Sequence, residues 1–306
     1  MKYLASAPSR ISLACGGTDV PPFCNRYGGL ALNVAINIKQ RCELTDQVGQ
    51  IQLDSLLYKA IVKYFGVSDL KLSLQNGFDG HMGAGLGSSG SAGVMLVSLF
   101  NKYTQSKLTK SEIVETAWKL ENKSLGKTGI QDQVAAMYGG VNYIVVNHLG
   151  NKVDIERFPI QDKGLKKHLS LYYLGGTRSS SQTQATLGTN QKSVEALLKY
   201  QEITQRALEC ISEGDFMRLG QLMNFAWELK KDANRKTTNS RIDDIYNIAM
   251  SAGAWGGKII GAGGNGYMIF MHEPHKRKQI SEVMVNKGAE EIKWDVDYNG
   301  CEVKKL

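Results

Sequence analysis

The sequence predicts an α+β fold divided into two domains. Segments with strand character alternate irregularly with segments of helical spacing along the 306 residues. A chain of this length suits two domains or one large domain. Glycine is abundant at 33 residues and proline scarce at 5, and many glycines gather in three segments, at 15–19, 83–93 and 253–266. Glycine clusters are expected where a loop must approach another group closely.

Apolar periodicity and capping signals place the elements of the N-terminal half. Residues 10–14 predict a strand that runs into the first glycine segment, and residues 30–44 alternate apolar and polar side chains over two strand lengths. Helical spacing begins at Ser55 and stops at Gly66, and a short strand is expected at 70–74. Thr109 and Glu112 form a capping box that starts a helix through about Lys123, and a β-branched run covers 141–146.

The C-terminal half is expected to repeat this mixture. A strand at 169–174 ends at two glycines, and helices follow at 191–212, at 215–230 and from 240 to about 252. The third glycine segment precedes a strand at 267–271. Polar stretches at 147–151 and 159–167 suggest a boundary near 150–165, so the expected domains are residues 1–160 and 161–306.

Composition excludes several classes of protein. The sequence has no run of about 18 apolar residues, which argues against a transmembrane helix, and its start lacks the apolar core of a signal peptide. Five cysteines without metal-binding spacing are typical of reduced thiols, so a cytoplasmic location is expected. The net charge of +8 is spread out, which favours a solvated basic surface over a nucleic-acid groove. A basic protein also attracts small anionic substrates. We therefore expect a small-molecule partner, no nucleic acid and no membrane; the oligomeric state is not indicated.

The second glycine segment carries the strongest functional signal. Residues 83–93, Gly-Ala-Gly-Leu-Gly-Ser-Ser-Gly-Ser-Ala-Gly, come directly before the apolar run 94–100. Backbone N–H groups of such a loop can surround an anion at a helix N-terminus, where the helix dipole adds its field. The segment has neither the lysine of a Walker A loop nor a strand-linked Gly-x-Gly-x-x-Gly pattern. A phosphate chain is the natural ligand, and a flexible turn before a buried helix is the alternative.

The order and the residues of the three glycine segments resemble those of the GHMP kinase superfamily. The resemblance extends over nearly the whole chain. Residues 7–23, Ala-Pro-Ser-Arg-Ile-Ser-Leu-Ala-Cys-Gly-Gly-Thr-Asp-Val-Pro-Pro-Phe, are similar to the start of the heptose kinases that phosphorylate D-glycero-D-manno-heptose 7-phosphate at its anomeric hydroxyl. The tail segment 256–264 matches the same group. The resemblance implies an N-terminal α/β domain with a phosphate loop and a C-terminal ferredoxin-like α+β domain. It also implies ATP as co-substrate and Mg²⁺ as the metal.

The resemblance assigns the nucleotide site to the second glycine segment. ATP would contact seven residues of that loop: Gly83, Gly85, Leu86, Gly87, Ser88, Ser89 and Gly90. Ser89 would offer its hydroxyl, and Glu121 its carboxylate, to Mg²⁺, which prefers oxygen ligands. The residues alone also allow Glu121 to be an exposed charge on a helix face.

Catalysis is assigned to two charged residues. Asp132 resembles the catalytic aspartate that takes or orients the proton of the acceptor hydroxyl, although it could be a first-turn charge that stabilises a helix. Arg10 would hold Asp132 ionised and offset charge on the transferred phosphoryl group. A surface arginine on an edge strand is the alternative for Arg10.

Substrate binding is expected at both ends of the chain. Asp19, with Thr18 and Gly17, resembles the segment that hydrogen-bonds sugar hydroxyls, but it could be only a turn. Arg178, beside Thr177, is the candidate for holding a substrate phosphate, and a surface-loop arginine is its alternative. Gly263 would let the backbone approach the substrate or the transferred phosphate; Gly256 and Gly257 could form only a tight turn.

The sequence also departs from the superfamily pattern. His81 and Met82 stand where a proline usually precedes the phosphate loop, and Asn265 replaces a common glycine. The expected activity is transfer of phosphate from ATP to the anomeric hydroxyl of a heptose 7-phosphate, giving the 1,7-bisphosphate. Another small-molecule kinase of the superfamily and a catalytically silent ligand sensor are the alternatives, and the presence of both Glu121 and Asp132 argues against the sensor.

Overall fold

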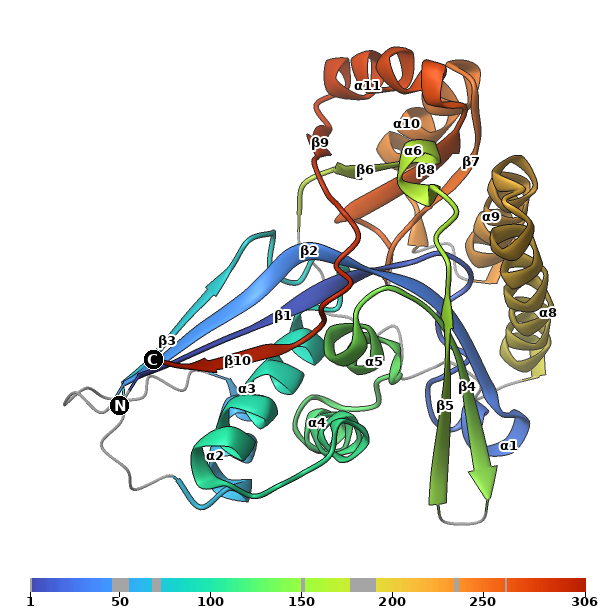
Figure 1. The fold of residues 1–306 in the computed structure, drawn as a ribbon. Coiled ribbons are helices and arrows are strands. Elements are labelled where there is room, and N and C mark those ends of the chain that lie inside the picture. The colour runs from blue at the N-terminus through green and yellow to red at the C-terminus, as the bar shows by residue number, and fades with distance from the viewer. Residues whose placement is uncertain are drawn as a thin grey trace.

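The α+β architecture expected from the sequence is confirmed. The computed structural model describes residues 2–45, 55–67, 73–149, 152–176, 191–233, 237–261 and 263–306. Within these residues the chain forms a six-stranded and a four-stranded β-sheet, and helices cover both (Figure 1). Among the described residues, no helix combines the length and apolar character needed to cross a bilayer.

The first sheet is antiparallel throughout. Its order is β10-β1-β2-β4-β5, and β3 pairs with the far half of β2. The strands are β1 (Lys2–Ser12), β2 (Gly29–Thr45), β3 (Ser73–Phe78), β4 (Val141–Leu149), β5 (Lys152–Ile160) and β10 (Glu302–Lys305). The alternating segment that suggested two strand lengths is one strand of 17 residues. It is long because β4 pairs with its first half and β3 with its second.

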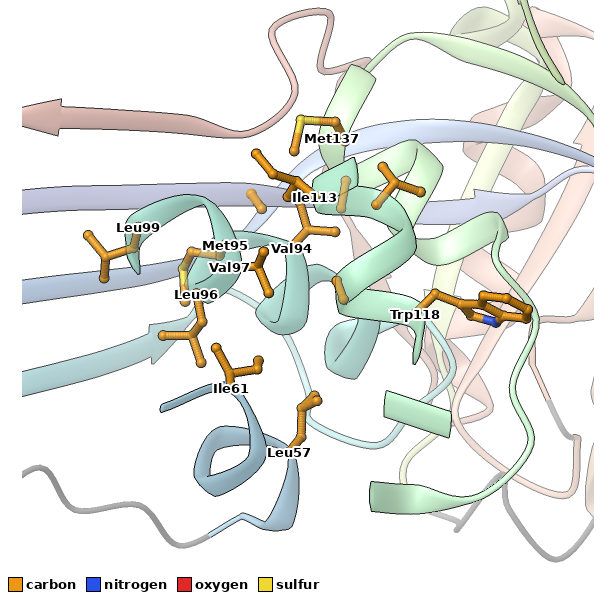
Figure 2. Packing of buried hydrophobic residues seen from close by; sticks show 14 of the residues in the cluster. Leu57, Ile61, Val94, Met95, Leu96, Val97, Leu99, Ile113, Trp118 and Met137 are labelled. Carbon is orange, nitrogen blue, oxygen red and sulfur yellow. The ribbon is translucent and has the colours of Figure 1, made fainter. Parts of the chain in front are cut away.

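Four described helices of the N-terminal half cover one face of this sheet (Figure 1). They are α2 (Leu56–Tyr64), α3 (Ser88–Thr104), α4 (Lys110–Leu125) and α5 (Gln131–Tyr138), and the short helix α1 (Phe23–Tyr27) lies apart from them, beside β2 and β4. The capping box expected at Thr109 and Glu112 is present, with both reciprocal hydrogen bonds, and Ser55 caps α2 by accepting the Tyr58 N–H. Residues 90–100 of α3 are all buried. Figure 2 shows five of them, Val94–Val97 and Leu99, in one apolar cluster with side chains of α2 and α4. This core holds the helix whose N-terminus carries the glycine loop.

The second sheet has the ferredoxin-like arrangement expected from the resemblance. Its strands are β6 (Leu169–Tyr173), β7 (Ala254–Ile259), β8 (Tyr267–His272) and β9 (Glu290–Ile292), in the antiparallel order β7-β8-β6-β9. Its helices are α6 (Leu165–His168), α8 (Gln191–Glu213), α9 (Phe216–Ala233), α10 (Ser240–Ser251) and α11 (Arg277–Asn286), and a 3₁₀ turn, η2 (Pro274–Lys276), precedes α11. Strands and helices thus follow in β-α-β-β-α-β order.

Several elements were not predicted from the sequence. The suggested boundary region contains β5, and the chain changes sheet after it, between Ile160 and Leu169. The division at residue 160 remains a proposal, since β10 returns from the C-terminal half to pair with β1. The first half of the third glycine segment is the strand β7 rather than a turn. It accepts glycines because it lies directly against α9.

One apolar core joins the two halves of the chain. It combines Ile11 and Leu32 of the first sheet with Leu171 and Ile269 of the second, and Leu86 of the glycine loop packs into it. All five side chains are at most 1% exposed. The loop is therefore anchored in the apolar layer where the two sheets meet.

The close approach of β7 to α9 predicts a large effect of one methyl group. A Cβ on Gly256 would lie 1.9 Å from the Gly220 carbonyl oxygen, far inside van der Waals contact, and the obstacle is backbone. We expect Gly256→Ala to lower the free energy of unfolding by about 1–3 kcal/mol or more, measured by urea denaturation. Gly77→Ala is the matched control, because Gly77 also lies in a strand but has open space around its Cα. Equal stability losses in the two variants would contradict this account of the packing.

Candidate active site

The second glycine segment forms a loop that ends in the N-terminus of α3. Gly83, Gly85 and Gly87 all have positive φ angles of 68°, 108° and 73°, which side-chain-bearing residues rarely adopt. Gly87 is the residue before α3, and no side chain caps the helix there. The first N–H groups of α3, at Ser88, Ser89 and Gly90, therefore have no acceptor within the helix. This arrangement suits a phosphate chain.

The loop rests directly on the third glycine segment. The Ala84 carbonyl accepts the Tyr267 N–H at 3.1 Å. A Cβ on Gly85 would lie 2.6 Å from the Ile260 carbonyl oxygen, and one on Gly266 would lie 2.2 Å from that of Ala84. Glycine is required at these positions because two backbones touch, so the second sheet positions the loop of the first domain.

Arg10 and Asp132 form an ion pair against this loop. The Arg10 Nε donates to Asp132 Oδ1 at 2.7 Å, and its Nη1 donates to the Gly85 carbonyl at 2.5 Å. The Asp132 carboxylate lies so close to the loop that a Cβ on Gly87 would be 2.7 Å from its Cγ. Arg10 is nearly buried, with 8% of its side chain exposed, so it is not the surface arginine of the alternative interpretation. The two residues assigned to catalysis thus adjoin the residues assigned to phosphate binding.

Glu121 is buried rather than exposed on a helix face. The Ser89 hydroxyl donates to its Oε1 at 2.5 Å, and the Gln133 amide donates to its Oε2. Burial, together with the nearby charge of Asp132, raises the pKa of Glu121 to about 7, although both hydrogen bonds and Arg10 act in the opposite direction. Two of the residues expected at a metal, Ser89 and Glu121, are in direct contact. Gln133 carries no signal in the sequence that would have marked it.

Two hydrogen-bond chains hold the start of α5, and with it Asp132. The Gln131 N–H donates to Asp19 Oδ2 at 3.1 Å. From the other side, the buried Asn33 amide donates to the Gln131 carbonyl at 3.0 Å, and Asn142 donates to Asn33 at 3.0 Å. Polar side chains of the first sheet therefore fix the backbone next to Asp132. Sequence reasoning missed both asparagines, since nothing in an alternating strand marks a buried amide.

The residues expected to bind the acceptor lie on two segments. Asp19 is fully buried, burial raises the pKa of its carboxyl, and its Oδ1 has no hydrogen-bond partner among the described residues. The Thr18 hydroxyl exchanges hydrogen bonds with the backbone of Leu30, so its side chain serves the turn. Gly17 and Gly263 both have positive φ, at 105° and 87°. The other two expected residues, Thr177 and Arg178, lie outside the described part of the chain.

The comparisons with known proteins agree with this geometry. The family model for the N-terminal domain of GHMP kinases matches residues 55–140, and that for the C-terminal domain matches residues 207–290. The chain belongs to the GHMP kinase family. It is therefore an ATP-dependent kinase, as the resemblance of its glycine segments implied.

Individual relatives cover most of this kinase. A D-glycero-alpha-D-manno-heptose 7-phosphate kinase of Campylobacter jejuni is 28% identical over 90% of this chain and 91% of its own. A mevalonate kinase of Thermococcus sibiricus is 27% identical over 74% of this chain and 67% of its own. Among solved structures, a putative sugar kinase of Campylobacter jejuni is 26% identical, with a TM-score of 0.77 over 100% of this chain and 98% of its own. The fold is also that of a D-glycero-D-manno-heptose 1-phosphate kinase from Bacteroides thetaiotaomicron, with a TM-score of 0.79, 24% identity and 99% coverage of both chains.

The donors around Glu121 fit a hard divalent cation. Within the described ranges, no group of three or more His, Cys, Asp or Glu side chains forms a metal site. A site at Ser89 and Glu121 would supply one hydroxyl and one carboxylate, so a cation there would need further oxygens, as the phosphates of a nucleotide provide.

The buried Glu121 predicts a pH-dependent loss of stability in the absence of ligands. Because its pKa rises from 4.5 to about 7 on folding, the folded state retains a proton that the unfolded state releases. The preference of folded Glu121 for its proton stabilises the protein fully below pH 4.5, and this stabilisation is lost as the pH rises to about 7. Glu121→Gln stays neutral, so we expect this variant to lose up to about 3 kcal/mol less than wild type between pH 4.5 and 8, measured by urea denaturation. Glu115→Gln, a partly exposed site on the same helix, is the control. Parallel pH profiles for wild type and Glu121→Gln would contradict the buried, protonated carboxyl.

Proposed function

We propose that this kinase transfers the γ-phosphoryl group of ATP to the anomeric hydroxyl of D-glycero-D-manno-heptose 7-phosphate, giving the 1,7-bisphosphate. The observation that carries the proposal is the Arg10–Asp132 pair, which lies against the phosphate loop at Gly85 and Gly87. The choice of sugar is supported by residues 7–23 and by the heptose 7-phosphate kinase relative, which aligns over 91% of its length.

The geometry supports a division of labour between the charged residues. Asp132 accepts or orients the proton of the attacking hydroxyl, and the Arg10 Nε, which donates to Asp132 Oδ1 at 2.7 Å, orients its carboxylate. The N–H groups at the start of α3 bind the phosphates of ATP. Ser89 and Glu121 would hold Mg²⁺, which neutralises phosphate charge when bound.

The acceptor is proposed to bind beside the first glycine segment. Asp19 Oδ1 is an acceptor without a donor among the described residues, which supports a hydrogen bond from a sugar hydroxyl. Gly17 and Gly263 would bring backbone close to the sugar. Thr18 would act through its backbone, since its hydroxyl bonds to Leu30. Thr177 and Arg178, which lie outside the described residues, are proposed to contact the acceptor as well.

The role of Asp132 is tested by removing its basicity while keeping its shape. We expect Asp132→Asn to lower kcat by roughly 10²–10⁴-fold, as is typical for loss of a general base. ATP affinity, measured by equilibrium titration, should change less than about threefold, because the phosphate loop is intact. Asp244→Asn, at an exposed position on α10, is the control for the loss of one carboxylate. A kcat for Asp132→Asn within about threefold of wild type would exclude the proposed role.

The choice of substrate is tested by ADP release with a panel of acceptors. We expect the highest kcat/KM with D-glycero-D-manno-heptose 7-phosphate, and at least about tenfold less with the free heptose, because charged hydrogen bonds to the phosphate are lost. Galactose and mevalonate serve as comparison substrates, since kinases for them are also relatives of this chain. A preference for any unphosphorylated acceptor would replace the proposed substrate. ADP release with none of them would favour a ligand sensor.

A further inference from the structure

Lys258 is a buried lysine that none of the roles above uses. It lies on β7, and only 6% of the residue is exposed. Its Nζ donates to the carbonyl of Ala14, a residue 244 positions earlier in the chain. Ala14 follows β1 and lies between Arg10 and the first glycine segment. The side chain thus reaches from the second sheet to the segment proposed to bind the acceptor.

In the described part of the chain, the charged groups that act on Lys258 include cations and no carboxylate. Lys258 forms no ion pair among the described residues, and its hydrogen-bond acceptor there, the Ala14 carbonyl, is neutral. The charged side chains that act on it are Lys230 of α9 and Arg10 of β1, both cationic. The adjacent Cys15 thiol is neutral at pH 7, because burial raises its pKa to about 12. The charge of Arg10 is already paired with Asp132.

A buried cation in such surroundings is costly unless an anion joins it. The cost is visible in the Lys258 ammonium, whose pKa is lowered to about 7, first by burial and then by Lys230 and Arg10. An anion with two charges would reverse both effects, because it supplies the missing partner for Lys258 and offsets the repulsion from Lys230.

We propose that Lys258, with Lys230 beside it, binds the anionic group that the acceptor substrate carries, a phosphate monoester. The inference rests on the proposed function for the identity of the acceptor, but not for the existence of the anion site. Lys258 contacts Ala14, next to the proposed sugar-binding segment, and Lys230 donates to the Gly261 carbonyl at 2.6 Å, two residues before Gly263. Both ammonium groups therefore adjoin segments assigned to the acceptor.

The terminal phosphate of ATP is the competing occupant. The structure favours the acceptor because the Lys258 Nζ contacts the segment after β1, whereas the phosphate loop places its N–H groups at the start of α3. The competing idea makes a different prediction, since it requires Lys258 to affect ATP binding.

The first experiment separates these occupants with Lys258→Met, which keeps an unbranched side chain one atom shorter and removes the charge. We expect its KM for heptose 7-phosphate to rise about tenfold or more, the loss typical of a charged hydrogen bond. The KM for ATP, and kcat/KM for the free heptose, should change less than about threefold. Lys293→Met, at an exposed lysine, is the matched control. Equal losses with the two sugars, or a KM effect confined to ATP, would overturn the proposal.

A second experiment needs neither the sugar nor activity. Inorganic sulfate, a dianion that does not titrate near neutral pH, is bound to wild type and to Lys258→Met in the presence of saturating ADP. Wild type should bind sulfate about tenfold or more tightly than the variant. If the enzyme does not use heptose 7-phosphate but this difference remains, the anion site stands and the proposed substrate fails. If the two proteins bind sulfate equally, the anion site fails whatever the substrate.

A third measurement applies if Lys258→Met does not fold. At pH 8 the Lys258 amine in wild type is mostly neutral, given a pKa of about 7. A bound dianion stabilises the ammonium form, so sulfate binding should take up a large fraction of one proton. Calorimetry in two buffers with different ionisation enthalpies measures this uptake. Binding without proton uptake at pH 8 would overturn the role of Lys258.

Discussion

The contact between two glycine-rich backbones is the constraint on which the site depends. Ala84 and Gly85 of the phosphate loop touch Ile260 and Gly266 of the segment around β8 so closely that side chains are excluded. The hydrogen bond from the Tyr267 N–H to Ala84 fixes their register. Because the loop is fixed, the Gly85 carbonyl is available to Arg10, and Arg10 in turn aligns Asp132. The position of the Arg10–Asp132 pair therefore depends on how the second sheet packs against the loop.

The two carboxyl groups of the site, Asp132 and Glu121, differ in burial and in hydrogen-bond partners. Asp132 is partly exposed and paired with Arg10, so its carboxylate has a cationic partner. Glu121 is more deeply buried, and its two donors among the described residues, Ser89 and Gln133, are neutral. Two carboxyl groups near one another thus differ in their surroundings, as the proposed roles of a base and a metal ligand require.

Local signals in the sequence predicted the elements with local causes. The capping box at Thr109, the apolar run of α3 and the strand at 169–173 were recognisable because neighbouring residues specify them. The resemblance of the glycine segments indicated the fold and brought together Arg10, Asp132, Ser89 and Glu121, which the structure places in contact as two pairs. Sequence reasoning predicted neither the burial of Glu121 nor its partner Gln133.

The features that were missed depend on partners far away in the chain. The sequence did not predict the strand β7, because Gly256 is typical of a turn. Glycine is needed there because Gly220 of α9 lies against the strand. Asn33 and Asn142 occupy strand positions with no distinctive local pattern. Their role depends on a hydrogen bond from Asn33 to the distant Gln131 carbonyl and on one from Asn142 to Asn33. The burial of Lys258 could not be predicted for the same reason, since its hydrogen-bond acceptor, Ala14, is 244 positions away in the chain. No local pattern encodes a contact at such a separation.

The return of β10 to the first sheet has a consequence for the nascent chain. Residues 302–305 pair with residues 3–6, so β1 cannot complete its hydrogen bonds until residue 305 has left the ribosome. Until then, one edge of β1 presents unpaired backbone groups, which are a template for pairing with other chains. The N-terminal half can bury its apolar helices early, but its sheet must wait for the second domain. During synthesis this edge of β1 therefore stays open until β10, at residues 302–305, has been made and pairs with it.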